Sequence, residues 1–261
     1  MSSDLIPDQP GATPPPTGSV RRPKTTGLAK GENVPGVAKN DPILIIDDVQ
    51  RRFGGLTAVD VKHLEIPRNA ITALIGPNGA GKTTLFNLLC GFDKPNSGRW
   101  SYDGKNLAGI PAFKVARMGQ VRTFQLTKAL ALLTVLENMK LGAPGQRGEK
   151  FWQSFVPRVW RPQEKQIEEK ARGLLARFKL DAKEKDFAAS LSGGQRKLLE
   201  MARALMSDPN LVMLDEPMAG VNPALTQSLL DHILDLKELG MTVLFVEHDM
   251  HMVRHIADWV V

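Results

Sequence analysis

The segment Gly76-Pro77-Asn78-Gly79-Ala80-Gly81-Lys82-Thr83 constrains the fold of this chain more than any other feature. It fits the pattern G-x-x-x-x-G-K-[ST], in which glycines let successive backbone N–H groups turn inward around phosphate oxygens. It follows an apolar run at residues 71–75 and precedes Thr83-Thr84-Leu85, which we expect to open a helix. The segment therefore predicts a strand, a phosphate-binding turn and a helix in direct succession.

Within this segment, Lys82 is placed to reach the β- and γ-phosphates of a nucleotide, and the Thr83 hydroxyl is placed to ligate Mg²⁺. A glycine-rich turn with an unrelated lysine is the alternative, but the surrounding strand and helix pattern disfavours it. We assign phosphate binding to the whole segment, called the phosphate loop, which comprises Gly76, Pro77, Asn78, Gly79, Ala80, Gly81, Lys82, Thr83 and Thr84.

Two acidic residues, Asp215 and Glu216, end another apolar run, Leu211-Val212-Met213-Leu214. A carboxylate there suits the shell of a magnesium ion, and we assign this role to Asp215. Glu216 suits the polarisation of an attacking water, while Lys82 and the metal neutralise the transferring phosphoryl group. Alone, such a pair is an ordinary start of a loop, so the interpretation depends on the phosphate-binding segment.

A second glycine-containing segment, Leu191-Ser192-Gly193-Gly194-Gln195, precedes a predicted helix at residues 196–206. Ser192 is a natural helix N-cap, and a simple cap with flexible glycines is one interpretation. The other is that Ser192, Gly193, Gly194 and Gln195 form a second phosphate-binding surface. Since one chain seldom needs two such surfaces, a head-to-tail dimer would explain both, with this segment of each chain facing the phosphate loop of the other.

The order of apolar runs and helical periodicities predicts an α/β fold. Strands are expected at residues 43–46, 59–66, 71–75, 211–214 and 242–246. Helices are expected at residues 112–118, 163–178, 196–206 and 224–239, where Gly240 is the stop, and in a segment that ends near residue 257. Strand–helix units of this kind imply a parallel sheet covered by helices.

Composition excludes several classes of protein. The 261 residues contain no run of about 18 apolar residues, the length that a membrane-spanning helix needs. The start, Met1-Ser2-Ser3-Asp4, lacks the basic and then apolar pattern of a secretory signal. The single cysteine, Cys90, excludes an internal disulfide and a multi-cysteine metal cluster. We therefore expect a soluble, intracellular protein.

Two segments stand apart from this pattern. Residues 1–40 carry seven of the 18 prolines and no apolar periodicity, so we expect a disordered tail there. Residues 143–162 are rich in Gly, Pro and Trp and predict an irregular insertion.

The net charge of +6 is concentrated at residues 145–185, with eleven Lys or Arg against six Asp or Glu. A solvated helix face is one explanation, and contact with lipid headgroups or nucleic acid is the other. With one tyrosine and no alternation of basic and aromatic residues, nucleic acid is disfavoured as a partner.

The phosphate loop, the Leu-Ser-Gly-Gly-Gln segment and the Asp-Glu strand end, in this order, resemble the ATP-binding cassette (ABC) ATPases over roughly residues 42–261. The resemblance implies a P-loop NTPase fold with a mixed or parallel sheet core, an antiparallel β subdomain and an α-helical subdomain at about residues 126–206. It also implies that Phe53 stacks on adenine, that Gln125 bridges Mg²⁺ and the transporter contact, and that His248 is the switch histidine. ATP and Mg²⁺ are the implied cofactors, and the implied catalytic residues are Lys82, Glu216 and His248.

Four shorter segments look like those of ATPases from bacterial branched-chain amino acid importers, namely Phe53-Gly54-Gly55-Leu56, Arg122-Thr123-Phe124-Gln125, Ala219-Gly220-Val221-Asn222-Pro223 and Glu247-His248-Asp249-Met250. That subfamily implies two transmembrane permease subunits and a substrate-binding protein as partners. It also implies a homodimer, or a heterodimer with a second ABC ATPase, at the cytoplasmic face of the plasma membrane. Related systems for urea, amides or lipopolysaccharide are the alternative.

Two other classes of function fit the sequence less well. ABC ATPases of DNA repair or translation typically carry two cassettes, long coiled coils or zinc-binding cysteine pairs, whereas this chain has one cassette, no heptad run and one cysteine. An inactive nucleotide binder is disfavoured because Lys82, Asp215, Glu216 and His248 are all present.

Two features depart from the family pattern. Many cassette ATPases have aspartate where this chain has Asn222. The chain also stops at Asp258-Trp259-Val260-Val261, inside a predicted strand, so we expect a fragment or a truncated reading frame.

Overall fold

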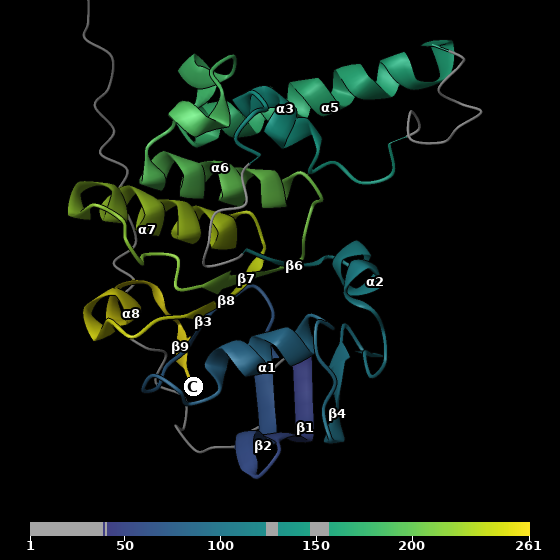
Figure 1. The fold of residues 1–261 in the computed structure, drawn as a ribbon, viewed down its shortest axis with the longest axis vertical. Helices are drawn as coiled ribbons and strands as arrows, with labels where there is room; N and C mark the ends of the chain where they lie inside the picture. Colours follow the sequence, from purple (N-terminus) through teal and green to yellow (C-terminus); the bar gives the residue numbers. More distant parts are fainter. Residues whose placement is uncertain (1–38, 40, 124–129, 147–156) are drawn as a thin grey trace, which may run out of the picture.

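The computed structural model of the chain describes residues 39, 41–123, 130–146 and 157–261, and its strands form two sheets (Figure 1). The antiparallel sheet has the order β2-β1-β4-β5 and consists of β1 (Pro42–Phe53), β2 (Leu56–Pro67), β4 (Ser97–Tyr102) and β5 (Lys105–Asn106). The parallel sheet has the order β6-β7-β8-β3-β9 and consists of β3 (Ile71–Leu74), β6 (Gln120–Arg122), β7 (Leu211–Asp215), β8 (Thr242–Val246) and β9 (Trp259–Val260).

The helices cover the parallel sheet on both faces. Figure 1 shows α1 (Lys82–Leu89) between the two sheets, and α7 (Pro223–Glu238) and α6 (Gly193–Leu205) stacked on the other face. A further layer, with α3 (Val135–Lys140) and α5 (Pro157–Arg177), lies over α6. The remaining helices are α2 (Ala112–Arg117), α8 (Met250–Ile256) and two 3₁₀ turns, Asp181–Lys183 and Ala188–Ser190.

Two hydrophobic cores meet at the parallel sheet. Val212 and Leu214 of β7 belong to the core beneath α6 and α7, whereas Leu211 and Met213 belong to the core around α1. Successive side chains of a strand point to opposite faces, so β7 supplies both cores. Every residue of β7 and of β8 is buried, as expected for strands covered by helices on one face and by α1 on the other.

Most of the predicted elements are confirmed. The strands at 43–46 and 59–66 are parts of β1 and β2, which pair in antiparallel fashion over their length. Gly240 ends the helical segment after α7 with a φ of 80°, and its N–H donates to the carbonyl of Lys237. The α/β fold, the parallel core sheet and the antiparallel sheet agree with the predicted fold class.

Two local predictions need correction, and three short strands have no counterpart among the predictions. Residues 157–162 are the start of α5, so the predicted irregular insertion at 143–162 is wrong at its carboxyl end. The helix predicted from Arg196 begins at Gly193, because Ser192 caps it one turn earlier. Strands β4, β5 and β6 were not predicted, since they are short and contain few aliphatic residues. The predicted tail at residues 1–40 lies almost entirely outside the described residues.

The predicted terminal strand is present as β9, at the edge of the parallel sheet beside β3. Thr72 and Ala73 pair with Trp259 and Val260. The register continues beyond the two strands, because the N–H of Ile75 donates to the carbonyl of Val261 at 2.9 Å. Residue 75 stands directly before the phosphate-binding segment, so β9 fixes the backbone at the entrance to that segment.

Phe245, fully buried in the middle of β8, tests the contribution of the core beneath α6 and α7 to stability. We expect Phe245→Ala to lower the free energy of unfolding by about 3–5 kcal/mol, because the substitution removes buried area and leaves a cavity. Urea denaturation measures this change. Phe187→Ala is the matched control, since that phenylalanine is 59% exposed and its truncation should cost far less. Equal effects of the two substitutions would contradict the described core.

Candidate active site

The phosphate-binding segment lies where the sequence predicts it, between β3 and α1. Gly79 and Gly81 have φ angles of 82° and 85°, in the left-handed region that residues with a Cβ atom avoid. At Gly81 the space is closed as well, since a Cβ atom would lie 1.9 Å from the carbonyl oxygen of Ala58 on β2. The path of the turn therefore requires glycine at position 81.

Lys82 is the first residue of α1 and folds its side chain back over the turn. Its Nζ donates hydrogen bonds to the carbonyl oxygens of Gly76 at 2.7 Å and Pro77 at 2.9 Å. The amino terminus of α1 adds the positive end of the helix dipole at the same place. Positive charge and backbone donors are thus concentrated where the sequence predicts a phosphate chain.

Three neighbouring parallel strands bring the other predicted residues to the same edge of the sheet. Asp215 pairs with Val246 of β8, and Val246 pairs with Leu74 of β3. Because the strands are parallel, the segments that follow β3, β7 and β8 all leave from one edge, which is where ligands bind in such sheets. Lys82, Glu216 and His248 follow these three strands.

The two carboxylates at the end of β7 have different surroundings. The side chain of Asp215 is 3% exposed, and its Oδ2 accepts a hydrogen bond from Nη2 of Arg122 at 2.6 Å. Glu216 is half-buried and has a φ of 46°, a left-handed conformation that is uncommon for a residue other than glycine. Strained backbone conformations are found preferentially at functional sites, and here the strained residue is the one predicted to activate water.

The histidine and its neighbour at the end of β8 also differ in exposure. His248 has a 63% exposed side chain, whereas that of Glu247 is 3% exposed. Glu247 Oε1 accepts a hydrogen bond from the N–H of Met218 at 3.1 Å, and burial raises the pKa of the Glu247 carboxyl. Glu247 therefore joins the end of β8 to the loop that follows Glu216, and His248 is left facing outward.

Lys197 is a functional candidate that the sequence analysis did not identify. It extends from α6, and its Nζ donates hydrogen bonds to the carbonyl oxygens of Pro217, at 2.9 Å, and Ala219. Burial lowers the pKa of this ammonium group. Together with Asp215 and Glu216, Lys197 lines a cavity of about 20 Å³. Lys197 thereby fastens α6 to the loop after β7.

Phe53, the predicted adenine platform, ends β1 at the turn Gly54-Gly55. The ring is 49% exposed, and the guanidinium carbon of Arg51 lies 4.4 Å from its centroid. An exposed aromatic face suits stacking on a base, and the packed arginine limits the positions of the ring.

Ser192 caps α6 as predicted. Its Oγ accepts from the N–H of Gln195 at 3.2 Å, while the Gln195 side chain accepts from the N–H of Ser192 at 3.0 Å. Gly194 packs closely against α7, since a Cβ atom there would lie 1.8 Å from Cδ2 of Leu225, whose side chain would have to shift. Ser192 and Gly193 are exposed, so the capped amino terminus of α6 is open to a ligand or a partner.

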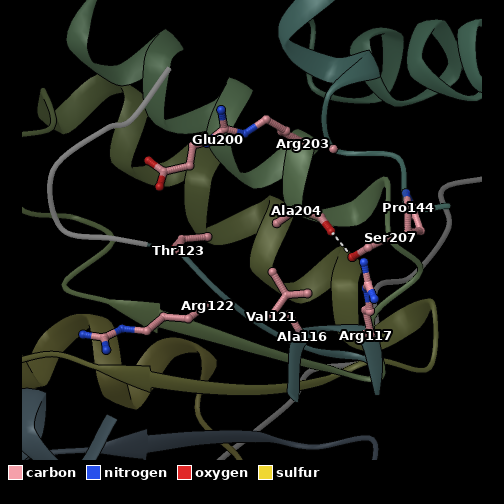
Figure 2. A pocket seen from close by; sticks show the side chains of 11 residues that line it. Ala116, Arg117, Val121, Arg122, Thr123, Pro144, Glu200, Arg203, Ala204 and Ser207 are labelled. Atoms are coloured by element: carbon pink, nitrogen blue, oxygen red, sulfur yellow. Dashed lines mark hydrogen bonds between the residues drawn. The ribbon is translucent and has the colours of Figure 1, made fainter. Parts of the chain in front are cut away.

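Gln125, the predicted magnesium and transporter contact, lies outside the described residues. A groove of about 370 Å³, drawn in Figure 2, lies between α2 and β6 on one side and α6 on the other. Arg117, Arg203 and Glu200 supply its charged groups, and Ser207 donates to the carbonyl of Ala204 at 2.9 Å in its wall. Thr123, the last residue described before Gln125, also lines the groove.

The residues present fit a magnesium ion that is bound mainly through a nucleotide. Mg²⁺ in phosphoryl-transfer sites keeps several waters and takes one or two protein oxygens beside the phosphates. Thr83 supplies an exposed hydroxyl in the first turn of α1, and Asp215 supplies a carboxylate of which Arg122 takes one oxygen. Among the described residues, no group of three His, Cys, Asp or Glu side chains could hold a metal without such a ligand.

Comparison with known proteins places this geometry in context. Residues 59–219 match the sequence profile of the ABC transporter family. The probable branched-chain amino acid transport ATP-binding protein LivG of Archaeoglobus fulgidus is 41% identical over 216 residues, which cover 83% of each chain. The high-affinity branched-chain amino acid transport ATP-binding protein BraF of Pseudomonas aeruginosa is 39% identical over 222 residues, or 84% of this chain and 87% of that protein.

Solved structures agree with these relatives. The crystal structure of a nucleotide-free ATP-binding cassette from an ABC transporter superimposes with a TM-score of 0.72 at 36% identity, over 84% of this chain and 86% of the other. The ADP conformation of MJ1267, an ATP-binding cassette of an ABC transporter, gives a TM-score of 0.71 at 38% identity, over 82% and 84%.

The contact between Gly81 and β2 yields a prediction with an internal control. Gly81→Ala should lower the free energy of unfolding by more than Gly79→Ala. Both substitutions place a Cβ atom on a left-handed backbone, which costs about 1–2 kcal/mol, but only the one at Gly81 meets the Ala58 carbonyl. Urea denaturation of the two variants measures the difference. Equal destabilisation would mean that β2 does not press against the turn.

Proposed function

Because the chain belongs to the ABC transporter family of ATP-binding cassettes, an ATPase family, we propose that it powers an importer for branched-chain amino acids. The assignment as an ATPase rests on the family. The names of LivG and BraF support the choice of solute, and so do the four short segments around Phe53, Gln125, Asn222 and His248. The solute would bind to the permeases and the binding protein, so we expect no residue of this chain to contact it.

One observation carries the proposed mechanism, namely the convergence of the phosphate loop, Glu216 and His248 on one edge of the parallel sheet. The loop N–H groups and Lys82 bind the phosphates of ATP and neutralise the charge that develops on the γ-phosphoryl group. Glu216 orients a water in line with that group and accepts its proton. His248, exposed beside it, contacts the γ-phosphoryl group and reports its presence.

Mg²⁺ is proposed to be held by Thr83, Asp215 and Gln125. The ion would supply charge neutralisation for the β- and γ-phosphates of bound ATP. The part played by this chain is to hold the Thr83 hydroxyl in the first turn of α1 and the Asp215 carboxylate at the end of β7.

A complete site is proposed to need two chains. Within one chain the phosphate loop opens α1, whose core lies on one side of the parallel sheet, and Ser192 opens α6, whose core lies on the other side. The exposed Ser192–Gln195 terminus of one chain would bind the γ-phosphate held by the other, and ATP would close the dimer. Its partner is a second copy or a similar ATPase.

The groove in Figure 2 is proposed as the permease contact. Thr123 lines this groove, and α2, β6 and α6 bound it, so a partner bound there would contact both α6 and β6. The proposed assembly has two permease subunits and a substrate-binding protein, with no nucleic acid. None of the helices in the described ranges combines the length and apolarity that a membrane crossing requires. The proposed location is peripheral, on the cytoplasmic face of the plasma membrane.

Glu216→Gln tests the assignment of the water-activating residue. The substitution keeps the size of the side chain but removes its basicity, so we expect the rate of ATP hydrolysis to fall about a hundredfold or more. Binding of ATP and ATP-dependent dimer formation should persist, as measured by size-exclusion chromatography. Glu238→Gln, an exposed position at the end of α7, is the control and should leave both properties unchanged. Undiminished hydrolysis in Glu216→Gln would remove Glu216 from its role.

Mixing two inactive variants tests the shared site. Lys82→Ala damages the phosphate loop, and Ser192→Arg blocks the amino terminus of α6. In a mixed dimer one site carries both defects and the other carries neither, so mixing should restore part of the ATPase rate. Each variant alone should stay inactive. If mixing restores nothing while the two chains still associate, the site does not combine residues of two chains.

A further inference from the structure

Arg122 forms a buried ion pair with the carboxylate that the proposed function assigns to magnesium. Its Nη2 lies 2.6 Å from Oδ2 of Asp215, and the two side chains are 5% and 3% exposed. In the sequence, Arg122 belongs to the segment Arg122-Thr123-Phe124-Gln125, which assigns no role to the arginine itself. A buried pair of this kind leaves an uncompensated charge when one partner is removed.

The same guanidinium also reaches the helix that carries Thr83. Nη1 of Arg122 donates to Oδ1 of Asn87 at 2.6 Å, and its central carbon lies 5.5 Å from the centroid of the Phe86 ring. Asn87 follows Thr83 by four residues on α1, so the two share one face of the helix. Arg122 therefore contacts both elements that carry the proposed magnesium ligands, β7 and α1.

The backbone of Arg122 is fixed as firmly as its side chain. Arg122 pairs with Met213 at the carboxyl end of β6, and the N–H of Thr123 donates to the Met213 carbonyl at 2.9 Å. Figure 2 shows the side chain leaving the groove wall and extending away from Ala204 and Ser207. The backbone of Arg122 therefore lies at the groove, whereas its guanidinium group contacts Asp215.

We propose that Arg122 is a positioning residue for magnesium: its guanidinium holds the Asp215 carboxylate in fixed register with α1, so that Asp215 and Thr83 face the same ion. The inference rests on the proposed function of Asp215 and Thr83. A guanidinium suits this role because its planar fork donates to two acceptors at once, which a lysine ammonium at the end of a flexible chain does not reproduce. Loss of a group that orients a metal ligand typically lowers metal affinity or activity about 10- to 100-fold.

The test compares nucleotide affinity with and without the metal. The dissociation constant of mant-ADP, a fluorescent ADP, is measured on the full chain in excess Mg²⁺ and again in EDTA. The constant in EDTA divided by the constant in Mg²⁺ is the factor by which the metal strengthens nucleotide binding. We expect Arg122→Lys and Arg122→Gln to lower this ratio about tenfold, with a smaller change in the affinity measured in EDTA. Arg68→Lys is the matched control, because the Arg68 guanidinium also donates to two acceptors, Asp41 and Asp103, beside the antiparallel sheet, and its ratio should equal that of the unmodified chain.

Asn87→Ala provides a second test that keeps the pair between Arg122 and Asp215. This substitution removes only the contact with α1, so we expect the ratio to fall in the same direction by a smaller factor. Thermal denaturation shows which variants are folded. If the Arg122 variants are unfolded, the ratio measured for Asn87→Ala alone decides whether the inference stands.

Three results would overturn the inference. The first is an unchanged ratio in Arg122→Lys, or in Asn87→Ala when that variant decides. The second is an equal loss of affinity in Mg²⁺ and in EDTA, which would indicate a general structural role. The third is an unmodified chain that binds mant-ADP equally well in both conditions, which would remove the proposed metal site itself and this inference with it.

Discussion

The parallel pairing of β3, β8 and β7 is the constraint on which the active site depends. Asp215, Val246 and Leu74 lie in one register, so the three segments that follow these strands begin side by side, although about 140 residues of chain separate Leu74 from Asp215. Each strand is short and buried, and its hydrogen bonds are shielded from water by α1 on one face and by α6 and α7 on the other. The backbone of the sheet therefore sets where the segments that carry the proposed catalytic groups begin.

Side-chain contacts then connect the loops to one another. Glu247 binds the backbone of Met218, and Lys197 binds the backbone of Pro217 and Ala219. Both anchors hold the loop that follows Glu216, one from β8 and the other from α6. Through these hydrogen bonds α6 is connected directly to the loop beside Glu216, the carboxylate proposed to activate water.

The sequence predicts the parts of this site whose chemistry depends on residue type and spacing. Glycines with left-handed φ angles, a lysine at the start of a helix and a serine cap all lie where their patterns place them. It does not predict the roles of Arg122 and Lys197, because each acts through a partner about 20 or more residues away, and a single charged side chain on a strand or helix is ordinarily solvated. β4 and β6 are missed for a related reason: their stability comes from pairing with β1 and β7, and their own residues give little periodic signal.

The edge strand β9 has a consequence for the dynamics of the phosphate loop. The N–H of Ile75, adjacent to Gly76, is bonded to the carbonyl of Val261, and β9 itself holds the sheet through a short ladder with β3. Fraying of so short an edge releases the Ile75 amide, and amide hydrogen exchange at that position would follow the opening of the edge. Nucleotide that orders the loop should slow this exchange, so a single backbone proton links occupancy of the phosphate loop to the pairing of β3 with β9.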